Sequence, residues 1–401
     1  MEYKRYGDFC LCSLGGAFPQ EATPCQLFSP LVFLVDREPQ HHRGWFGIRS
    51  VDEIFEEETA AVLTPREKQQ GDLEELRDFV EEWGATVLNT AFSRCFSFLT
   101  APKTAKKMTL VGLGDVGGTL LTALKLLDSS IEEIAVYDPN EAQCKRYEAE
   151  LNQVLGRGSP RITIARKEEL FSCDVFLFTA SRGVPAVGQQ VQDVRMVQYA
   201  LNRDMLKVYA RQAREAGFMG LFCQISDPVD QLSRVVFLES NRNEAGVFDG
   251  KGLLPEQIQG FGLGVMAARA AYYGRREGID FSHGCAFGPH GKDLIVANDP
   301  LNYDPALSER LTELTVQANL EVRSYGFKPY IAPALSSAAL SILPLLRGEV
   351  HYGAVPIGGA YLGCRSSFSK QGLLIEKQPL HEQLLSRIET VRKKLEDFDY
   401  D

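Results

Sequence analysis

The sequence lacks the features that mark membrane, secreted and nucleic-acid-binding proteins. No apolar run reaches the roughly 18–20 residues that a transmembrane helix needs. No cluster of lysine and arginine occurs, and the 401 residues carry a net charge of −10, which argues against a nucleic-acid surface. The first residues are polar and are soon interrupted by Asp8, unlike a signal peptide. We therefore expect no membrane and no nucleic-acid partner.

The cysteines lack a pattern as well. Nine of them are scattered without paired spacing, which fits a reducing compartment better than a disulfide scaffold. Cys10, Cys12 and Cys25 could be metal ligands, but they are spaced more closely than the usual ligand pairs and no partner cluster follows. We expect core cysteines, no metal and a cytoplasmic location. The hydrophobic content of 44% and the charged content of 24% are those of an ordinary globular protein of two or three domains.

A glycine-rich segment, residues 111–118 with the sequence VGLGDVGG, carries the strongest local signal. It lies between an apolar strand and a helical pattern. Gly112 permits a tight turn, Gly114 lets the backbone approach a pyrophosphate, and Gly117 lets the helix pack closely on the strand. The alternative is an ordinary glycine-rich turn between a strand and a helix. The flanking strand and helix favour a dinucleotide site.

Two neighbouring features sharpen this prediction. The helix begins at Asp115 and Val116, where free N–H groups and a positive dipole end would face the phosphates. Asp138 ends the next strand, where a carboxylate can accept hydrogen bonds from both ribose hydroxyls. The same carboxylate would repel a 2′-phosphate. We therefore predict NAD as the cofactor.

The pattern divides the chain into three parts. Residues 1–106 predict a small α/β extension, with strands at 28–35 and 85–100 and a helix at 65–83. From residue 107 to 240, short apolar runs alternate with helical patterns, which predicts an NAD-binding Rossmann domain with a doubly wound parallel sheet. The expected strands of this domain are 108–112, 134–137, 161–165, 175–180 and 220–226.

Residues 241–401 predict an α+β domain that carries the substrate site. The crevice between domains would collect residues at the carboxyl ends of the parallel strands. The expected helices are 257–277, 304–325 and 380–398, and the expected strands are 350–364 and 373–376.

One constellation in the last domain suggests chemistry. His283 and His290 lie on either side of a glycine-rich turn, and histidine is the natural proton donor to a carbonyl at neutral pH. Arg269, on the preceding helix, could grip a carboxylate through two hydrogen bonds, and Arg195, beyond the fourth strand, could polarise a carbonyl. Each of these arginines taken alone could equally be a solvated surface residue.

Taken together, these motifs resemble the lactate/malate dehydrogenase superfamily over about residues 107–400. The glycine fingerprint and the ribose-binding aspartate match, and the remaining motifs follow in the family's order. They are Thr179-Ala180-Ser181 after the fourth strand, Arg195 with Asn202 seven residues later, Ser226-Asp227-Pro228-Val229-Asp230, the His-Gly turn at 283–291, and a Gly-x-Tyr-x-Gly hairpin at 359–363.

The resemblance implies roles for these residues. His290 would be the acid/base, Arg269 the clamp for the substrate carboxylate, and Arg195 the loop arginine that polarises the carbonyl. It also implies a small carboxylate substrate and a homodimer or homotetramer. The residues expected at the cofactor are Gly112, Gly114, Asp115, Val116, Gly117, Asp138, Thr179, Ala180, Asn202, Ser226 and Asp227, and those expected at the substrate are Gln189, Arg195, Asn202, Arg269 and His290.

Departures from the family pattern, and one residue that varies within the family, bear on function. The family pairs its catalytic histidine with an aspartate three residues before the clamp arginine, and here that position is Met266. Without the aspartate, His290 should hold its proton less firmly, and reduction of a keto acid should weaken above mild acidity. Asp227 replaces an asparagine near the nicotinamide. Gln189 falls where malate-specific members carry an arginine and lactate-specific members a glutamine, which disfavours a dicarboxylate.

Three functions are compatible with these observations. The first is an NAD-dependent oxidoreductase acting on a 2-hydroxy or 2-oxo acid other than simple lactate or malate. The second is an NAD-binding sensor or interaction protein with lost catalysis, favoured by Met266 and Asp227 and opposed by the retention of the histidine and both arginines. The third is an NAD-dependent glycosidase with a bound metal, whose available ligands would be Cys223, His283 and Cys285.

Overall fold

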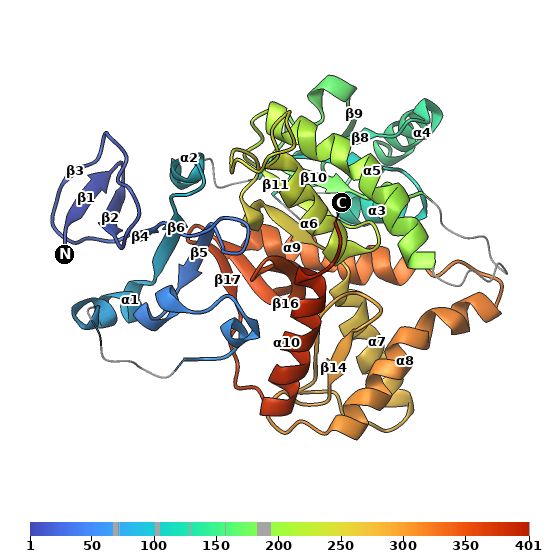
Figure 1. Ribbon diagram of the computed structural model, residues 1–401. Coiled ribbons are helices and arrows are strands. Elements are labelled where there is room, and N and C mark those ends of the chain that lie inside the picture. The colour runs from blue at the N-terminus through green and yellow to red at the C-terminus, as the bar shows by residue number, and fades with distance from the viewer. Residues whose placement is uncertain are drawn as a thin grey trace.

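The computed structural model describes residues 1–66, 71, 73–100, 105–127, 130–156, 158–182 and 194–400. For Thr100 and residues 194–197 it describes the backbone only. Within this part of the chain, fifteen strands join into one sheet and two more form a separate hairpin. Figure 1 shows the N-terminal extension on one side of the molecule, with the cofactor half and the C-terminal half side by side on the other.

The cofactor half is a parallel sheet covered by helices on both faces. Alternate residues of one strand point to opposite faces: Phe176 packs under one helix pair, and Leu177 packs in the core on the other face. This arrangement confirms the predicted doubly wound sheet. Its strands, from one side to the other, are β12 (Ile258–Gly260), β11 (Leu221–Gln224), β10 (Val175–Phe178), β7 (Lys107–Val111), β8 (Glu133–Tyr137) and β9 (Arg161–Ile164), and its helices are α3 (Asp115–Leu126), α4 (Glu141–Leu151), α5 (Val194–Glu215) and α6 (Val229–Ser240).

The helix expected at 257–277 begins later than predicted. Its first residues form β12, which extends the parallel sheet, and α7 (Leu263–Arg276) follows. A Cβ at Gly260 would lie 2.8 Å from the side chains of Val229, Ser233 and Ala354, so the strand needs glycine at this crowded point. A three-residue buried strand leaves too short a pattern to be distinguished from the start of a helix.

The C-terminal half packs helices against a twisted antiparallel unit. The helices expected at 304–325 and 380–398 and the strand expected at 373–376 are present within a few residues of their predicted ends. The segment expected as a strand at 350–364 turns back at Gly358 and Gly359, which both have positive φ, and therefore forms two antiparallel strands, the second of which continues to Ser369. The elements are the hairpin β13 (Cys285–Phe287) and β14 (Ile295–Ala297), α8 (Pro305–Ser324), a π-helical segment η6 (Pro333–Ala339), α9 (Leu340–Arg347), β15 (His351–Ile357), β16 (Ala360–Ser369), β17 (Gly372–Ile375) and α10 (Glu382–Glu396).

The extension is a mixed α/β unit, as expected, but residues 85–100 do not form one strand. The strand stops at Asn89, and Cys95–Thr100 is a short helix with Cys95, Phe98 and Leu99 buried at helical spacing. Of the helix expected at 65–83, only the last seven residues form an α-helix, preceded by a 3-10 turn; Pro65, Arg66, Gly71 and Leu73 are not helical, and residues 67–70 and 72 lie outside the described residues. The elements are β1 (Tyr3–Tyr6), β2 (Phe9–Ser13), β3 (Thr23–Pro24), β4 (Leu31–Val35), β5 (Trp45–Ile48), α1 (Arg77–Trp83), β6 (Ala85–Asn89) and α2 (Cys95–Thr100), with 3-10 turns η1 (Val51–Phe55), η2 (Ala60–Leu63) and η3 (Glu74–Leu76).

The extension joins the rest of the molecule through the sheet itself. Strand β5 pairs with β6 on one side and with β17 on the other, so the order runs β3-β1-β2-β4-β6-β5-β17-β16-β15-β12 without interruption. No helix among the described residues is long and apolar enough to cross a membrane.

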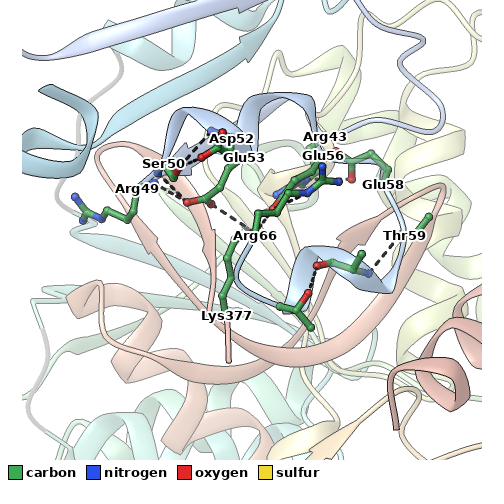
Figure 2. Close-up of polar contacts among 12 residues, drawn as sticks. Arg43, Arg49, Ser50, Asp52, Glu53, Glu56, Glu58, Thr59, Arg66 and Lys377 are labelled. Carbon is green, nitrogen blue, oxygen red and sulfur yellow. Dashed lines mark hydrogen bonds and ion pairs between the residues drawn. The ribbon is translucent and has the colours of Figure 1, made fainter. Parts of the chain in front are cut away.

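A buried ion cluster, defined here as Arg43, Glu56, Glu58 and Lys377, reinforces the junction (Figure 2). Arg43 lies 2.9 Å from Glu58 and stacks over the ring of Phe46, with its guanidinium carbon 4.0 Å from the ring centre. Lys377, just after β17, bonds to Glu56 of the extension. Each of these buried charges has a partner of opposite sign, and the attraction within these pairs offsets the cost of removing the charges from water.

Candidate functional site

The glycine turn between β7 and α3 has the steric properties of a phosphate cradle. Gly112 has a φ of +96°, and a Cβ there would lie 2.6 Å from the backbone nitrogen of Ala180. A Cβ at Gly117 would lie 1.9 Å from the carbonyl oxygen of Gly112. At Gly114, by contrast, a Cβ would meet no atom within 4 Å. Two of these glycines hold the turn, and the third leaves an open face.

The open face adjoins the first turn of α3, whose N-cap is Gly114 without a side-chain cap. Its leading N–H groups are therefore available to an anion, which suits a pyrophosphate. Asp115 is exposed and forms an ion pair of 3.1 Å with Lys328, which moderates its negative charge, and Val116 is half-buried beside it. These residues fit the NAD that the glycine fingerprint predicts.

Asp138 lies at the end of β8, next to the turn. One carboxylate oxygen accepts the N–H of Leu113 at 2.8 Å, and the other accepts the N–H of Asn140 at 2.8 Å. The carboxylate is thus held in a fixed orientation beside the cradle. Each oxygen retains a further lone pair, as ribose hydroxyls require.

The remaining residues predicted at the cofactor tie the strand ends together. The hydroxyl of Thr179 donates to the carbonyl of Gly112 at 2.7 Å, and that of Ser226 donates to Ala180 at 2.6 Å. Asn202 is fully buried. Its amide donates to the carbonyl of Asp227 at 2.8 Å and accepts the N–H of Arg182 at 2.7 Å. Because the polar groups of Thr179, Ser226 and Asn202 are hydrogen-bonded within the protein, these side chains hold the backbone of the strand ends in place.

His290 occupies the turn of the β13–β14 hairpin. Its backbone N–H donates to the carboxylate of Asp230 at 3.1 Å, and its ring packs against the N-cap of α7 so closely that a Cβ at Gly262 would lie 2.6 Å from Nδ1. Burial raises the pKa of Asp230 to about 7, against the lowering effect of the His290 N–H. The sequence showed Asp230 only as the last residue of a motif. Its contact with His290 spans 60 positions and leaves no local signal.

Arg269 lies two turns along α7 and is largely buried. Its Nη2 donates to the side-chain oxygen of Asn319 on α8 at 2.6 Å. Burial lowers the pKa of Arg269, while the nearby Tyr273 and Asp227 act to raise it. Met266, where the family carries an aspartate, is also buried, and its sulfur lies 3.9 Å from Nη1 of Arg269. Asn319 was missed because one polar residue on a long amphipathic helix is unremarkable in sequence.

The other predicted residues are either not described at their side chains or lie elsewhere in the molecule. Gln189 lies outside the described residues, and Arg195 lies in the first turn of α5, where only the backbone is described. His283 is exposed, ahead of β13. Cys223 is buried in β11 and Cys285 in β13, within different parts of the core. Among the residues that the structure describes, no three metal-ligating side chains form a group, so the glycosidase interpretation loses its basis.

No family model matches the chain. It is 24% identical over 273 residues to the malate dehydrogenase of Sulfurimonas denitrificans, covering 64% of this chain and 81% of that protein. It is 24% identical over 325 residues to the L-lactate dehydrogenase of Staphylococcus epidermidis, covering 74% and 96%.

Solved structures agree in fold. A lactate dehydrogenase from a deep-sea metagenome of the Medee basin superposes with a TM-score of 0.58 at 19% identity, covering 73% of this chain and 97% of that one. The malate dehydrogenase of Archaeoglobus fulgidus in complex with NADH gives 0.58 at 18% identity, covering 72% and 97%. At this identity the likeness establishes the fold.

Proposed function

Because the chain belongs to the lactate/malate dehydrogenase superfamily, we propose that it is an NAD-dependent oxidoreductase that interconverts a 2-hydroxy and a 2-oxo carboxylic acid. One observation carries the proposal. His290 is held between Asp230 and the first turn of α7, and the same helix bears the buried Arg269. A proton donor and a carboxylate-binding cation are thus fixed to one helix, which is what the protonation of a bound keto acid requires.

The cofactor proposal rests on the turn between β7 and α3. NAD bound there would supply or accept a hydride at the substrate carbon. The open face at Gly114 and the uncapped helix end support pyrophosphate binding, and the carboxylate of Asp138 supports NAD over NADP.

In the substrate site, Asn319 presets the orientation of the clamp. Its bond engages Nη2, while among the described residues Nη1 has only the weak contact with the sulfur of Met266, which a substrate carboxylate would replace. We propose His290 as the acid/base and Arg195, in the first turn of α5, as the arginine that polarises the carbonyl. Asp227 adds a negative charge near Arg269, which supports a substrate other than simple lactate or malate. Gln189, by the family pattern, would disfavour a second carboxylate.

A second candidate is an NAD-binding sensor or interaction protein of the same fold. Met266 favours it, because an apolar side chain occupies the position from which the family's aspartate stabilises the protonated histidine. In this case NADH would bind tightly without turnover.

We also propose that the chain forms a homodimer or homotetramer and works in a reducing, cytoplasmic compartment. Large apolar side chains with 57–69% exposure follow α8 and begin α9, namely Tyr325, Phe327, Ile331 and Leu340. Figure 1 shows α8 on the side away from the extension, and we propose the exposed side chains there as the contact with a second copy. Sedimentation of Phe327→Glu should show a smaller species than the unmodified protein; an unchanged size would rule this surface out.

The deciding experiment follows NADH absorbance at 340 nm against a panel of 2-oxo acids, with and without ammonia, from mildly acid to neutral pH. His290→Ala should lower the rate by about 10²–10⁴-fold, the usual contribution of a positioned acid/base. His283→Ala, in the exposed histidine seven residues earlier, is the matched control and should keep full activity. NADH binding without turnover on any substrate would replace the first candidate by the second.

A further inference from the structure

A buried cation lies where the extension meets helix α6 and the turn between β15 and β16. Arg234, in the second turn of α6, is only 7% exposed. Among the described residues no hydrogen bond or ion pair reaches its guanidinium, and its Nε is buried without a partner. The ring of Phe237 lies 5.1 Å from the guanidinium carbon. An unpaired buried charge is costly, so a partner from outside the chain would be strongly favoured.

Arg234 lines a cavity of about 210 Å³ including its open mouth, of which the enclosed part accommodates roughly one oxygen-sized atom. The extension contributes His41, His42 and Arg43 to the wall. Arg43 is already neutralised by Glu58 at 2.9 Å, as Figure 2 shows. Arg234 has no such carboxylate.

Two carboxylates, Glu38 and Glu396, act electrostatically on Arg234, but both form hydrogen bonds or ion pairs with other groups. Glu396 lies 3.0 Å from Arg392 and 3.1 Å from His41. Glu38 accepts the N–H groups of Gln40 and His41 at 2.9 Å each. Both influence the charge of Arg234 electrostatically without touching it. Of the two arginines that line the cavity, Arg234 is therefore the one whose charge no carboxylate contacts.

We infer that this cavity binds a small inorganic anion: chloride, or one oxygen of an oxyanion such as phosphate whose remainder lies at the mouth. A guanidinium offers planar paired donors that suit either ligand. The anion would contact Arg234 of α6 and the 39–43 segment together, so it would hold the extension against the catalytic half.

Helix α6 connects this cavity to the candidate active site. Asp230, which holds the N–H of His290, precedes Arg234 by one helical turn on the same face. An anion at Arg234 would therefore restrain the residue that positions His290. This coupling, unlike the binding itself, rests on the proposed function.

Binding is tested on the full chain by thermal unfolding during titration with sodium chloride and, separately, sodium phosphate. The wild type should show a saturable rise in Tm of about 2–5 °C. Arg234→Met should lose the saturable rise and, since it removes an unpaired charge, unfold at a higher temperature than wild type in anion-free buffer. Arg146→Met removes an exposed arginine of α4 and should behave like the wild type.

The comparison of variants separates this site from phosphate attracted by the glycine turn, because only the former depends on Arg234. A rise with chloride, with phosphate or with both supports the inference and identifies the ion. Equal rises in wild type and Arg234→Met would overturn it. If Arg234→Met fails to fold, equilibrium dialysis of wild type with labelled chloride and with labelled phosphate decides, with saturating NADH present to occupy the glycine turn. One ion per chain supports the inference, and none overturns it.

The coupling is read from kcat/KM, which should change with the anion in wild type and stay constant in Arg234→Met. Anion binding with unchanged kinetics would overturn the coupling alone. Absence of turnover in every sample would be a failure of the proposed function, and the thermal result would stand independently of it.

Discussion

Two regions of the molecule treat their buried polar groups differently. At the strand ends of the cofactor half, Gly117 and Asn202 fix backbone through steric fit and paired hydrogen bonds. Where α6 and the segment before β12 face His290 and the extension, Asp230, Glu256 and Arg234 are ionisable groups whose burial is only partly compensated. The buried polar groups of the first region are satisfied within the protein. Those of the second region are balanced only by a proton or a ligand, and we expect regulation and chemistry there.

The largest effect is expected for Gly117→Ala, which disrupts the steric fit of the cofactor half. The new Cβ would lie 1.9 Å from a backbone oxygen, so we expect a loss of at least about 4 kcal/mol in the free energy of unfolding, together with loss of NADH binding. Gly114→Ala is the matched control. Its Cβ meets no atom and its φ is −73°, so stability should hold while NADH binds more weakly. Denaturant unfolding and NADH fluorescence measure both; equal destabilisation of the two variants would contradict the steric argument.

The charged side is tested by Glu256→Gln. Burial raises the pKa of Glu256 to about 8, and one of its oxygens accepts the N–H of Gly44 in the extension at 2.8 Å. Below about pH 4.5 the carboxyl is neutral in both folded and unfolded chains. Between pH 4.5 and 8 only the unfolded chain ionises freely, so wild-type stability falls as pH rises.

The glutamine is neutral throughout. It should therefore gain stability relative to wild type by about 3–4 kcal/mol over that window. Chemical denaturation at pH 4.5, 6 and 8 gives the difference, and a constant difference across the series would show that Glu256 is not held neutral by the fold.

Met266→Asp restores the family's carboxylate to the catalytic half. The new charge is buried next to Arg269, so we expect a loss of about 2 kcal/mol in stability, softened by that ion pair. If His290 is the acid, the same variant should reduce a 2-oxo acid faster at neutral pH and shift the pH profile of kcat upward. A profile identical to wild type would mean that position 266 does not act on the histidine.

The smallest effect is expected for Asp227→Asn. If Asp227 binds an amino or hydroxyl group of the substrate, KM should rise by roughly tenfold while kcat changes little. Arg269→Ala is the companion variant and should abolish activity on every carboxylate. Unaltered kinetics in Asp227→Asn would assign substrate recognition to Arg269 without Asp227.

The features that could be predicted from the sequence are those whose interactions join residues close together in the chain. The turn at Gly112 and the strand ending at Asp138 are encoded within about 30 residues, and their predicted arrangement is the one observed. The helix at Cys95 was misread because buried cysteine and phenylalanine also suit a strand.

The contacts of the candidate site are of another kind. Asp230 reaches His290 across 60 positions, and Asn319 reaches Arg269 across 50. Arg234 stands out only in the folded structure, because its buried guanidinium has no carboxylate or hydrogen-bond partner among the described residues. Motif matching finds residues that a family shares, but charge balance depends on residues brought together by the fold.

The pairing of β5 with β17 determines which strand lies at the edge of the sheet. Without the extension, β17 would present a row of unsatisfied backbone groups, a template for unwanted pairing between molecules. With the extension present, the edge strand on this side of the sheet is β3. It has two residues and ends in Pro24, which has no backbone N–H to donate. A truncated chain starting near residue 107 would therefore be prone to aggregate, and the first hundred residues act as a built-in safeguard against self-association through the sheet.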